Sequence, residues 1–162
     1  MSSYPGISAE KKGGIMEKEP FLVRQISVFL DNKPGRLAKM TRHLAARGIN
    51  LRALSLTESR EFCTARIVVH DPDKCMEILK EADYHCSETY VLVIAVSDEV
   101  GGMADMLEII AGERINIDYV YSLVDAGKGL AGIILRTGDP LKAGTALKAK
   151  GVKLLGPEDI TA

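Results

Sequence analysis

The chain has 162 residues, of which 46% are hydrophobic and 27% are charged, which is typical of a globular protein with one domain or two small ones. Lysine and arginine number 21 and aspartate and glutamate 22, so the overall charge does not favour nucleic acid or an anionic membrane as a partner. No apolar run reaches the ~18 residues that cross a bilayer, and the first residues lack the apolar core of a secretion signal. We therefore expect a cytoplasmic protein.

Cysteine usage agrees with a reducing compartment. The three cysteines are an odd number and include no Cys-x-x-Cys pair, so we interpret them as reduced thiols. The three histidines are scattered, and none has metal-ligand spacing with another histidine or cysteine. No serine, histidine and aspartate form a recognisable catalytic motif. We predict no catalytic site, no metal site and no cofactor.

An internal repeat organises the sequence. Gly35 aligns with Gly101, Met40 aligns with Met106, and an Ile-Asn pair follows in both copies. Matched glycine, Ile-Asn and Asp-Pro positions in one order indicate two copies of one module. Residues 1–20 are polar and without periodicity, and we predict a flexible leader there. The two modules are then expected at 21–90 and 91–162.

The first copy reads as strand, helix, strand, strand, helix, strand. Its elements are expected at 22–30, 35–47, 49–59, 62–70, from 72 onward and at 84–90. Ile26, Val28 and Leu30 alternate along the first strand and should share its buried face. Gly48 can end the first helix in a left-handed cap, and Asp71 can cap the second.

The second copy follows the same plan. Its elements are expected at 91–97, 103–113, 115–124, 130–137, from 140 to about 150 and at 152–155. The fold class is thus α+β, with two ferredoxin-like βαββαβ modules, each an antiparallel sheet with helices on one face. Both faces of the strands near 91–97 and 130–137 are apolar, which disfavours water on the helix-free face. We predict that the other module or a second chain covers this face or edge.

The segment Asp-Asn-Lys-Pro-Gly joins the first strand to the first helix. Pro34 fixes φ before the helix, and Gly35 leaves the backbone open to close approach. The unpaired N–H groups of the first helical turn can bind a carboxylate, while Asp31 and Asn32 can meet an ammonium group. Asn50 opens the next strand, which we expect to begin at the same end of the sheet. These features predict an α-amino-acid site, although Pro-Gly and Asn50 also suit a turn with no ligand.

This turn, followed thirteen residues later by Gly-Ile-Asn-Leu in a duplicated βαββαβ frame, resembles the ACT domain, a small regulatory module of amino-acid metabolism. The resemblance covers about Val23 to Leu155 and implies a free-standing tandem-ACT protein. Such a protein is expected to be a non-enzymatic homodimer that binds an amino acid at this turn, near an interface between modules. In the serine-binding ACT domain of phosphoglycerate dehydrogenase, a histidine and an asparagine precede the turn and a second asparagine follows the helix. Here Leu30 replaces that histidine, whereas Asn32 and Asn50 match the asparagines.

The second module departs further from the family pattern. Asp98 stands for the first asparagine, Val100 replaces the proline, and Asn116 matches the later asparagine. The first turn is therefore the stronger prediction. The ligand-binding residues implied in the two modules are Asp31, Asn32, Lys33, Pro34, Gly35, Arg36, Leu37, Asn50, Leu51, Asp98, Gly101, Gly102, Met103, Asn116 and Ile117.

Two other functions remain open. A regulatory subunit of a biosynthetic enzyme, similar to the small subunit of acetolactate synthase, would also carry an ACT module. A ferredoxin-like nucleic-acid binder would need exposed aromatics, and Tyr119 and Tyr121 share one strand face. Finally, the first helix is basic and its counterpart in the second copy is acidic, which can steer modules or chains into one pairing.

Overall fold

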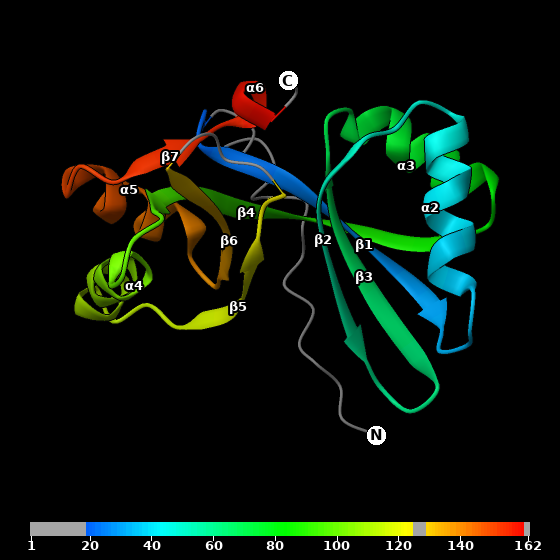
Figure 1. The fold of residues 1–162 in the computed structure, drawn as a ribbon, viewed down its shortest axis with the longest axis horizontal. Coiled ribbons are helices and arrows are strands. Elements are labelled where there is room, and N and C mark those ends of the chain that lie inside the picture. Colours follow the sequence, from blue (N-terminus) through cyan, green and yellow to red (C-terminus); the bar gives the residue numbers. More distant parts are fainter. Residues whose placement is uncertain (1–18, 125–128, 161–162) are drawn as a thin grey trace.

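The computed structural model describes residues 19–124 and 129–160 and contains seven strands and five helices in that part of the chain (Figure 1). Most of the predicted leader lies outside the described residues. The elements in chain order are β1 (Leu22–Asp31), α2 (Arg36–Ala46), β2 (Leu51–Glu58), β3 (Phe62–Val69), α3 (Pro72–Glu81), β4 (His85–Ser97), α4 (Gly102–Gly112), β5 (Ile117–Ser122), β6 (Leu130–Thr137), α5 (Pro140–Ala149), β7 (Lys153–Leu155) and α6 (Pro157–Ile160).

Two βαββαβ modules share one antiparallel sheet in the order β2-β3-β1-β4-β6-β5, with β7 also paired to β4. The first part of β4 pairs with β1, from His85 opposite Phe29 to Leu92 opposite Leu22. The remainder of β4 pairs with β6 and β7. The predicted break into two strands between 90 and 91 is wrong, because this strand of 13 residues is rich in β-branched and aromatic residues and has no glycine or proline to interrupt it.

Each module has a core beneath its own helices. Ile26, Val28 and Leu30 are buried under α2 and α3, as their alternation predicts. Gly48 and Gly151 follow their helices with φ of +79° and +77°, and Asp71 and Asp139 cap α3 and α5. The repeat in the sequence is thus a repeat in local structure, down to its helix caps.

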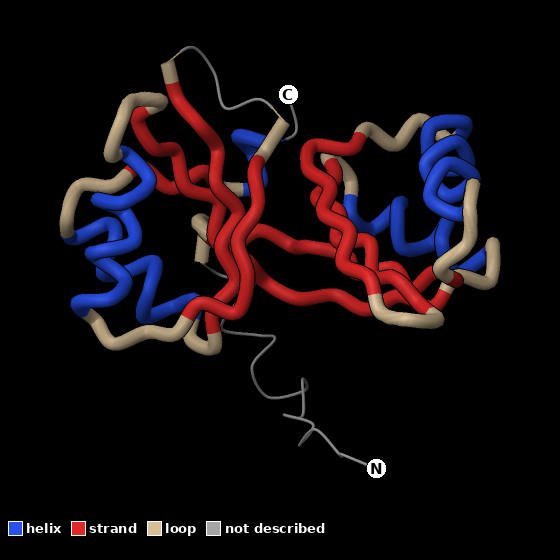
Figure 2. Tube along the Cα trace, turned by 60° about the horizontal axis from the view of Figure 1, so that its bottom comes forward, coloured by secondary structure: helices blue, strands red, loops and turns tan. Residues whose placement is uncertain are grey.

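The helix-free faces of the two modules pack against each other, with helices on the two outer sides (Figure 2). A third core lies between them and includes Val23, Val68, Val93 and Ile134. Each such side chain contributes about 1.5–3 kcal/mol on burial. The prediction that the apolar helix-free face is covered is confirmed, and the cover is the other module of the same chain.

The two edge strands also meet. The Val124 N–H donates to the carbonyl of Arg52, 2.9 Å away, which joins the end of β5 to the start of β2. The sequence did not predict this contact, nor the short helix α6, whose Ile160 is buried in the core between the modules. These contacts fix the modules as one packed pair.

The basic helix α2 and the acidic helix α4 lie on opposite outer sides of the molecule (Figure 1). The idea that they attract each other within one chain is therefore wrong, and attraction between chains stays a prediction. Among the described helices, none is both long and apolar enough to cross a membrane.

Candidate functional site

The first turn is tied to the β2–β3 hairpin. The Asn32 N–H donates to the carbonyl of Glu61 at 3.0 Å, and its side-chain amide donates to the carbonyl of Ser59 at 3.2 Å. Asp31 forms an ion pair with Arg36 at 3.1 Å, and both side chains are 44% exposed. An exposed pair of this kind contributes only ~0–1 kcal/mol, so a ligand can displace it. Both residues predicted to meet an ammonium group thus already have protein partners.

Gly35 begins α2 in the left-handed conformation, with φ of +81° and no side chain capping the helix. A Cβ added there would have no atom within 4 Å, so the space above the turn is open. The second helix of each module differs, because Asp71 and Asp139 accept hydrogen bonds of 3.0 Å from the N–H groups of Lys74 and Lys142. The start of α2 therefore keeps the positive end of the helix dipole available to an anion.

The second turn repeats this arrangement with different chemistry. Gly101 begins α4 with φ of +98° and again no side-chain cap. Val100 is fully exposed where the first module has Pro34, and a Cβ on Gly102 would lie 2.2 Å from the carbonyl oxygen of Ser97. The adjacent Asp98 is exposed and would repel a carboxylate. Turn two is thus a poorer anion receptor than turn one.

The two asparagines that follow the first helices do not lie near these turns. Asp31 pairs with Phe62 at one end of the first module, whereas Leu51 pairs with Val69 at the other. The expectation that Asn50 shares an end of the sheet with Gly35 is therefore wrong. β1 and β2 run in the same direction, because both are antiparallel to β3. The chain must therefore return through α2 to the end of the sheet where β1 starts before β2 can begin. The Asn50 N–H instead donates to Nδ1 of His70 at 3.2 Å.

The same relation holds in the second module, where Ile117 pairs with Thr137 at the end of the sheet remote from Ser97. Asn116 is exposed there. The hydrophobic neighbours of the predicted sites are partly buried and pack against the module cores; these are Leu37, Leu51, Met103 and Ile117. The structure brings together residues 31–37 and, separately, 98–103, and it leaves Asn50 and Asn116 apart from both.

Tyr119 and Tyr121 share a face, as predicted, but that face points at the first module. Both hydroxyl groups bond to the fully buried Gln25, and the Arg66 guanidinium lies 4.3 Å from the Tyr119 ring centroid. These tyrosines are therefore not an exposed platform for bases.

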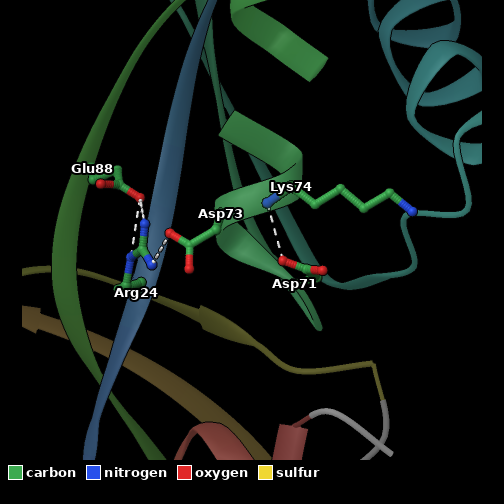
Figure 3. A network of polar contacts seen from close by, with 5 residues as sticks. All are labelled: Arg24, Asp71, Asp73, Lys74 and Glu88. Atoms are coloured by element: carbon green, nitrogen blue, oxygen red, sulfur yellow. Dashed lines mark hydrogen bonds and ion pairs between the residues drawn. The ribbon is translucent and has the colours of Figure 1, made fainter. Parts of the chain in front are cut away.

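Sequence reasoning missed a charged cluster at the start of β1 (Figure 3). The Arg24 guanidinium donates to Glu88 on β4 and, at 2.7 Å, to Asp73 on α3. Burial lowers the pKa of Arg24, but the hydrogen bonds that it donates to Asp73 and Glu88, together with the charges of these carboxylates, outweigh burial and raise the pKa overall. An arginine near the start of a largely buried strand was the available signal.

Two hollows lie near the start of β1, at the opposite end of that strand from the first turn. The larger has a volume of about 630 Å³ and is formed by Pro20, Phe21, the end of α5, β7 and α6. The smaller, of about 190 Å³, is lined by Arg24, His70 and Tyr90 among others. Residues 32–36 and 98–101 of the turns are exposed in a single chain.

Comparisons with known proteins agree with the fold. The family model of the ACT domain pair matches residues 21–161. Protein BT0572 from Bacteroides thetaiotaomicron has a similar crystal structure, with a TM-score of 0.81 and 35% identity over 87% of this chain and 96% of that chain. No curated protein sequence matches the chain.

Two regulatory subunits of aspartate kinase share the fold. The ligand-free subunit from Thermus thermophilus has a TM-score of 0.57 and 17% identity, and the subunit from Thermus flavus has 0.53 and 18%. Both matches cover 81% of this chain and 93% of the other. The repeated βαββαβ modules, the glycine turns and the family match lead to one conclusion: the chain belongs to the ACT-domain family and carries a pair of ACT modules.

Proposed function

We propose that this protein is a non-enzymatic regulatory protein that binds an amino acid at the turn preceding α2. The observation that carries the proposal is the contrast between helix starts. The second helix of each module is capped by aspartate, whereas α2 begins at an uncapped left-handed glycine in open space. Unpaired N–H groups at such a start favour a carboxylate. Membership of the ACT family supports an amino acid as the source of that carboxylate.

The position of the asparagines adds a constraint. Because Asn32 and Asn50 lie at opposite ends of the first module, one ligand can contact both only when they come from two copies of the chain. Phe29 and Phe62, on the helix-free face beside the turn, are 48% and 53% exposed. An exposed aromatic pair next to a ligand site suits an interface. A homodimer that covers this face and completes the site is therefore part of the proposal.

Ligand binding would act through the packing of modules or chains. A ligand shifts such an equilibrium only by its differential affinity for the two arrangements. A site between two copies meets this requirement, since separating the copies removes the contacts that one copy makes with the ligand. A partner protein would then respond to the altered assembly.

The experiment is a thermal-shift screen of the twenty proteinogenic amino acids, because a ligand of the native state raises the melting temperature. We expect Gly35→Val and Asn50→Ala each to abolish the shift. Asn50→Ala is the cleaner variant, because the Asn50 backbone N–H bonds to His70 whereas its side chain makes no hydrogen bond to another described residue. A shift that survives both variants would place the ligand elsewhere, and no shift with any amino acid would overturn the proposal.

The exposed Phe29 and Phe62 also favour a second candidate, binding of single-stranded nucleic acid through base stacking. Binding of this kind weakens steeply with salt. A gel shift with a mixed-sequence single strand, lost at high salt and lost in the Phe29→Ser, Phe62→Ser double variant, would support it. Absence of any shift at low salt would exclude it.

A role as the regulatory subunit of a biosynthetic enzyme is the remaining alternative. It predicts that the chain co-purifies with a large catalytic protein. A tagged chain recovered as a homodimer alone would favour the free-standing protein.

A further inference from the structure

The larger hollow, which we call the C-terminal groove, lies where the residues before β1 pack against the last elements of the second module. One wall comes from Pro20 and Phe21, which lead into the first strand of the first module. The other walls come from the end of α5, from β7 and from α6, the last elements of the second module. Figure 1 shows β7 and α6 beside the start of β1. The groove therefore spans the beginning and the end of the ACT pair.

Two glycines make this junction possible. A Cβ on Gly144 would lie 2.2 Å from Cε2 of Phe21, and a Cβ on Gly156 would lie 2.2 Å from the carbonyl oxygen of Pro20. Neither position tolerates a side chain while Pro20 and Phe21 keep their place. The Phe21 ring, only 7% exposed, is thus held against α5 and is a rigid apolar part of the wall.

The charges of the groove come from two different elements. Lys148 on α5 places Nζ 5.3 Å from the Phe21 ring centroid. Glu158 and Asp159 are contributed by α6. One oxygen of Asp159, Oδ2, accepts a 2.8 Å hydrogen bond from the Gly156 N–H, which fixes the orientation of that carboxylate. The groove thus combines one cation, two carboxylates and apolar surface.

This arrangement matches the charge pattern of a zwitterion. A volume of about 630 Å³ falls within the usual ~300–1,000 Å³ of small-molecule sites. An α-amino acid carries a carboxylate for Lys148 and an ammonium group for the carboxylates of α6. Its side chain can lie on the apolar surface formed by Phe21 and Leu154.

We propose that the C-terminal groove is a second binding site for an apolar α-amino acid, with Lys148 receiving the carboxylate and Glu158 and Asp159 receiving the ammonium group. The inference rests on the proposed function for its class of ligand, but it assigns a separate site. A ligand here touches Pro20 and Phe21, which lead into β1, and the last helix of the second module. Its binding stabilises the contact between these segments, since the groove exists only while Pro20 and Phe21 keep their place.

The test is isothermal titration calorimetry of the full chain with the twenty proteinogenic amino acids. The titration is then repeated with two analogues of each amino acid that binds. One is its amide, which lacks the carboxylate, and the other is the matching deaminated acid, which lacks the ammonium group. We expect an apolar amino acid to bind and both analogues to bind at least about tenfold more weakly, since each has lost a charge-assisted contact. Lys148→Met and Glu158→Gln should each lower the affinity for the amino acid by about tenfold. Lys150→Met, at the same end of α5 but outside the groove, is the matched control and should leave the affinity for the amino acid unchanged.

The variants separate this inference from the proposed function. Binding that survives Lys148→Met and Glu158→Gln but is lost in Asn50→Ala would overturn the groove site and keep the turn site. Binding lost in the groove variants and unchanged in Gly35→Val and Asn50→Ala would support the groove and reject the turn. A wild-type chain that binds none of the amino acids would reject both.

Discussion

The hydroxyl group of Tyr121 donates a 2.8 Å hydrogen bond to Oε1 of Gln25 across the junction of the two modules. Gln25 is fully buried, and its Nε2 donates to the hydroxyl oxygen of Tyr119 at 2.7 Å. Both ends of the amide are thus paired with the second module. Any other packing of the two helix-free faces would leave this amide buried without partners, which costs free energy. The cluster therefore favours one relative placement of the modules.

Replacing Tyr121 with phenylalanine should destabilise the protein by about 1–3 kcal/mol, because the buried Oε1 of Gln25 loses its donor while the packing of the ring is kept. Urea unfolding measures this change. Tyr84→Phe is the control, since Tyr84 packs against the first module's core and its hydroxyl group makes no hydrogen bond to another described residue. Its effect should stay within about 0.5 kcal/mol.

A double-mutant cycle tests the same contact more sharply. Gln25→Leu removes the acceptor, so adding Tyr121→Phe to it should cost much less than Tyr121→Phe alone. A coupling energy of about 0.5–3 kcal/mol is expected for residues in one hydrogen-bond network. Strictly additive effects would show that the two side chains do not interact in solution.

Alkaline pH should weaken the fold through Cys75. Burial raises the pKa of this thiol from 9.0 to about 12, with a smaller contribution from Cys86. Below pH 9 the thiol is protonated in both folded and unfolded chains, so its contribution is complete. Between pH 9 and 12 the unfolded chain loses the proton first, and stability falls by up to about 1.4 kcal/mol per pH unit. Urea unfolding across this range should show a steeper loss for the wild type than for Cys75→Ala, and equal slopes would contradict the assignment.

Much of the fold follows from local rules. Alternation identified the inward face of β1, and the Asp-Pro and glycine positions located most helix ends. The predicted boundary inside β4 failed because one continuous strand serves both modules, and its sequence bears no signal at the point where its partner changes from β1 to β6. Pairing partners are set by contacts distant in sequence, which local propensity does not encode.

The candidate site was predictable only in part. The glycine conformation and the uncapped start of α2 follow from residue types. The position of Asn50 required the direction of each strand, and the correct topology alone would have placed it at the far end of the sheet. Gln25 looked like a polar interruption of a strand, because its partners, Tyr119 and Tyr121, come from the other module.

The aspartate caps should contribute measurably to stability. Asp71→Ala and Asp139→Ala each remove an acceptor 3.0 Å from a helical N–H group, and each should cost about 0.5–2 kcal/mol. Asn at either position should restore most of the loss, since its carbonyl can accept the same bond. Urea unfolding of the four variants measures this, and an alanine effect below about 0.3 kcal/mol would mean that the caps are frayed in solution.

The two ends of α4 offer a matched pair of glycine-to-alanine changes. Gly112 ends the helix with nothing within 4 Å of an added Cβ, so Gly112→Ala should stabilise the protein by up to about 1 kcal/mol through helix propensity and a less flexible unfolded chain. At Gly102 the Cβ would lie 2.2 Å from the carbonyl oxygen of Ser97, an atom of the backbone that cannot rotate away. Gly102→Ala should therefore force the second turn to move and cost about 1–3 kcal/mol.

The sign of the two effects is the decisive observation, because both changes add the same methyl group to the same helix. Thermal unfolding of the two variants should give melting temperatures on opposite sides of the wild type. If Gly102→Ala instead stabilised the chain as much as Gly112→Ala, the close approach of Ser97 to the start of α4 would be absent in solution. The second turn would then be free to adopt the more open form of the first, where a Cβ on Gly35 meets no neighbouring atom.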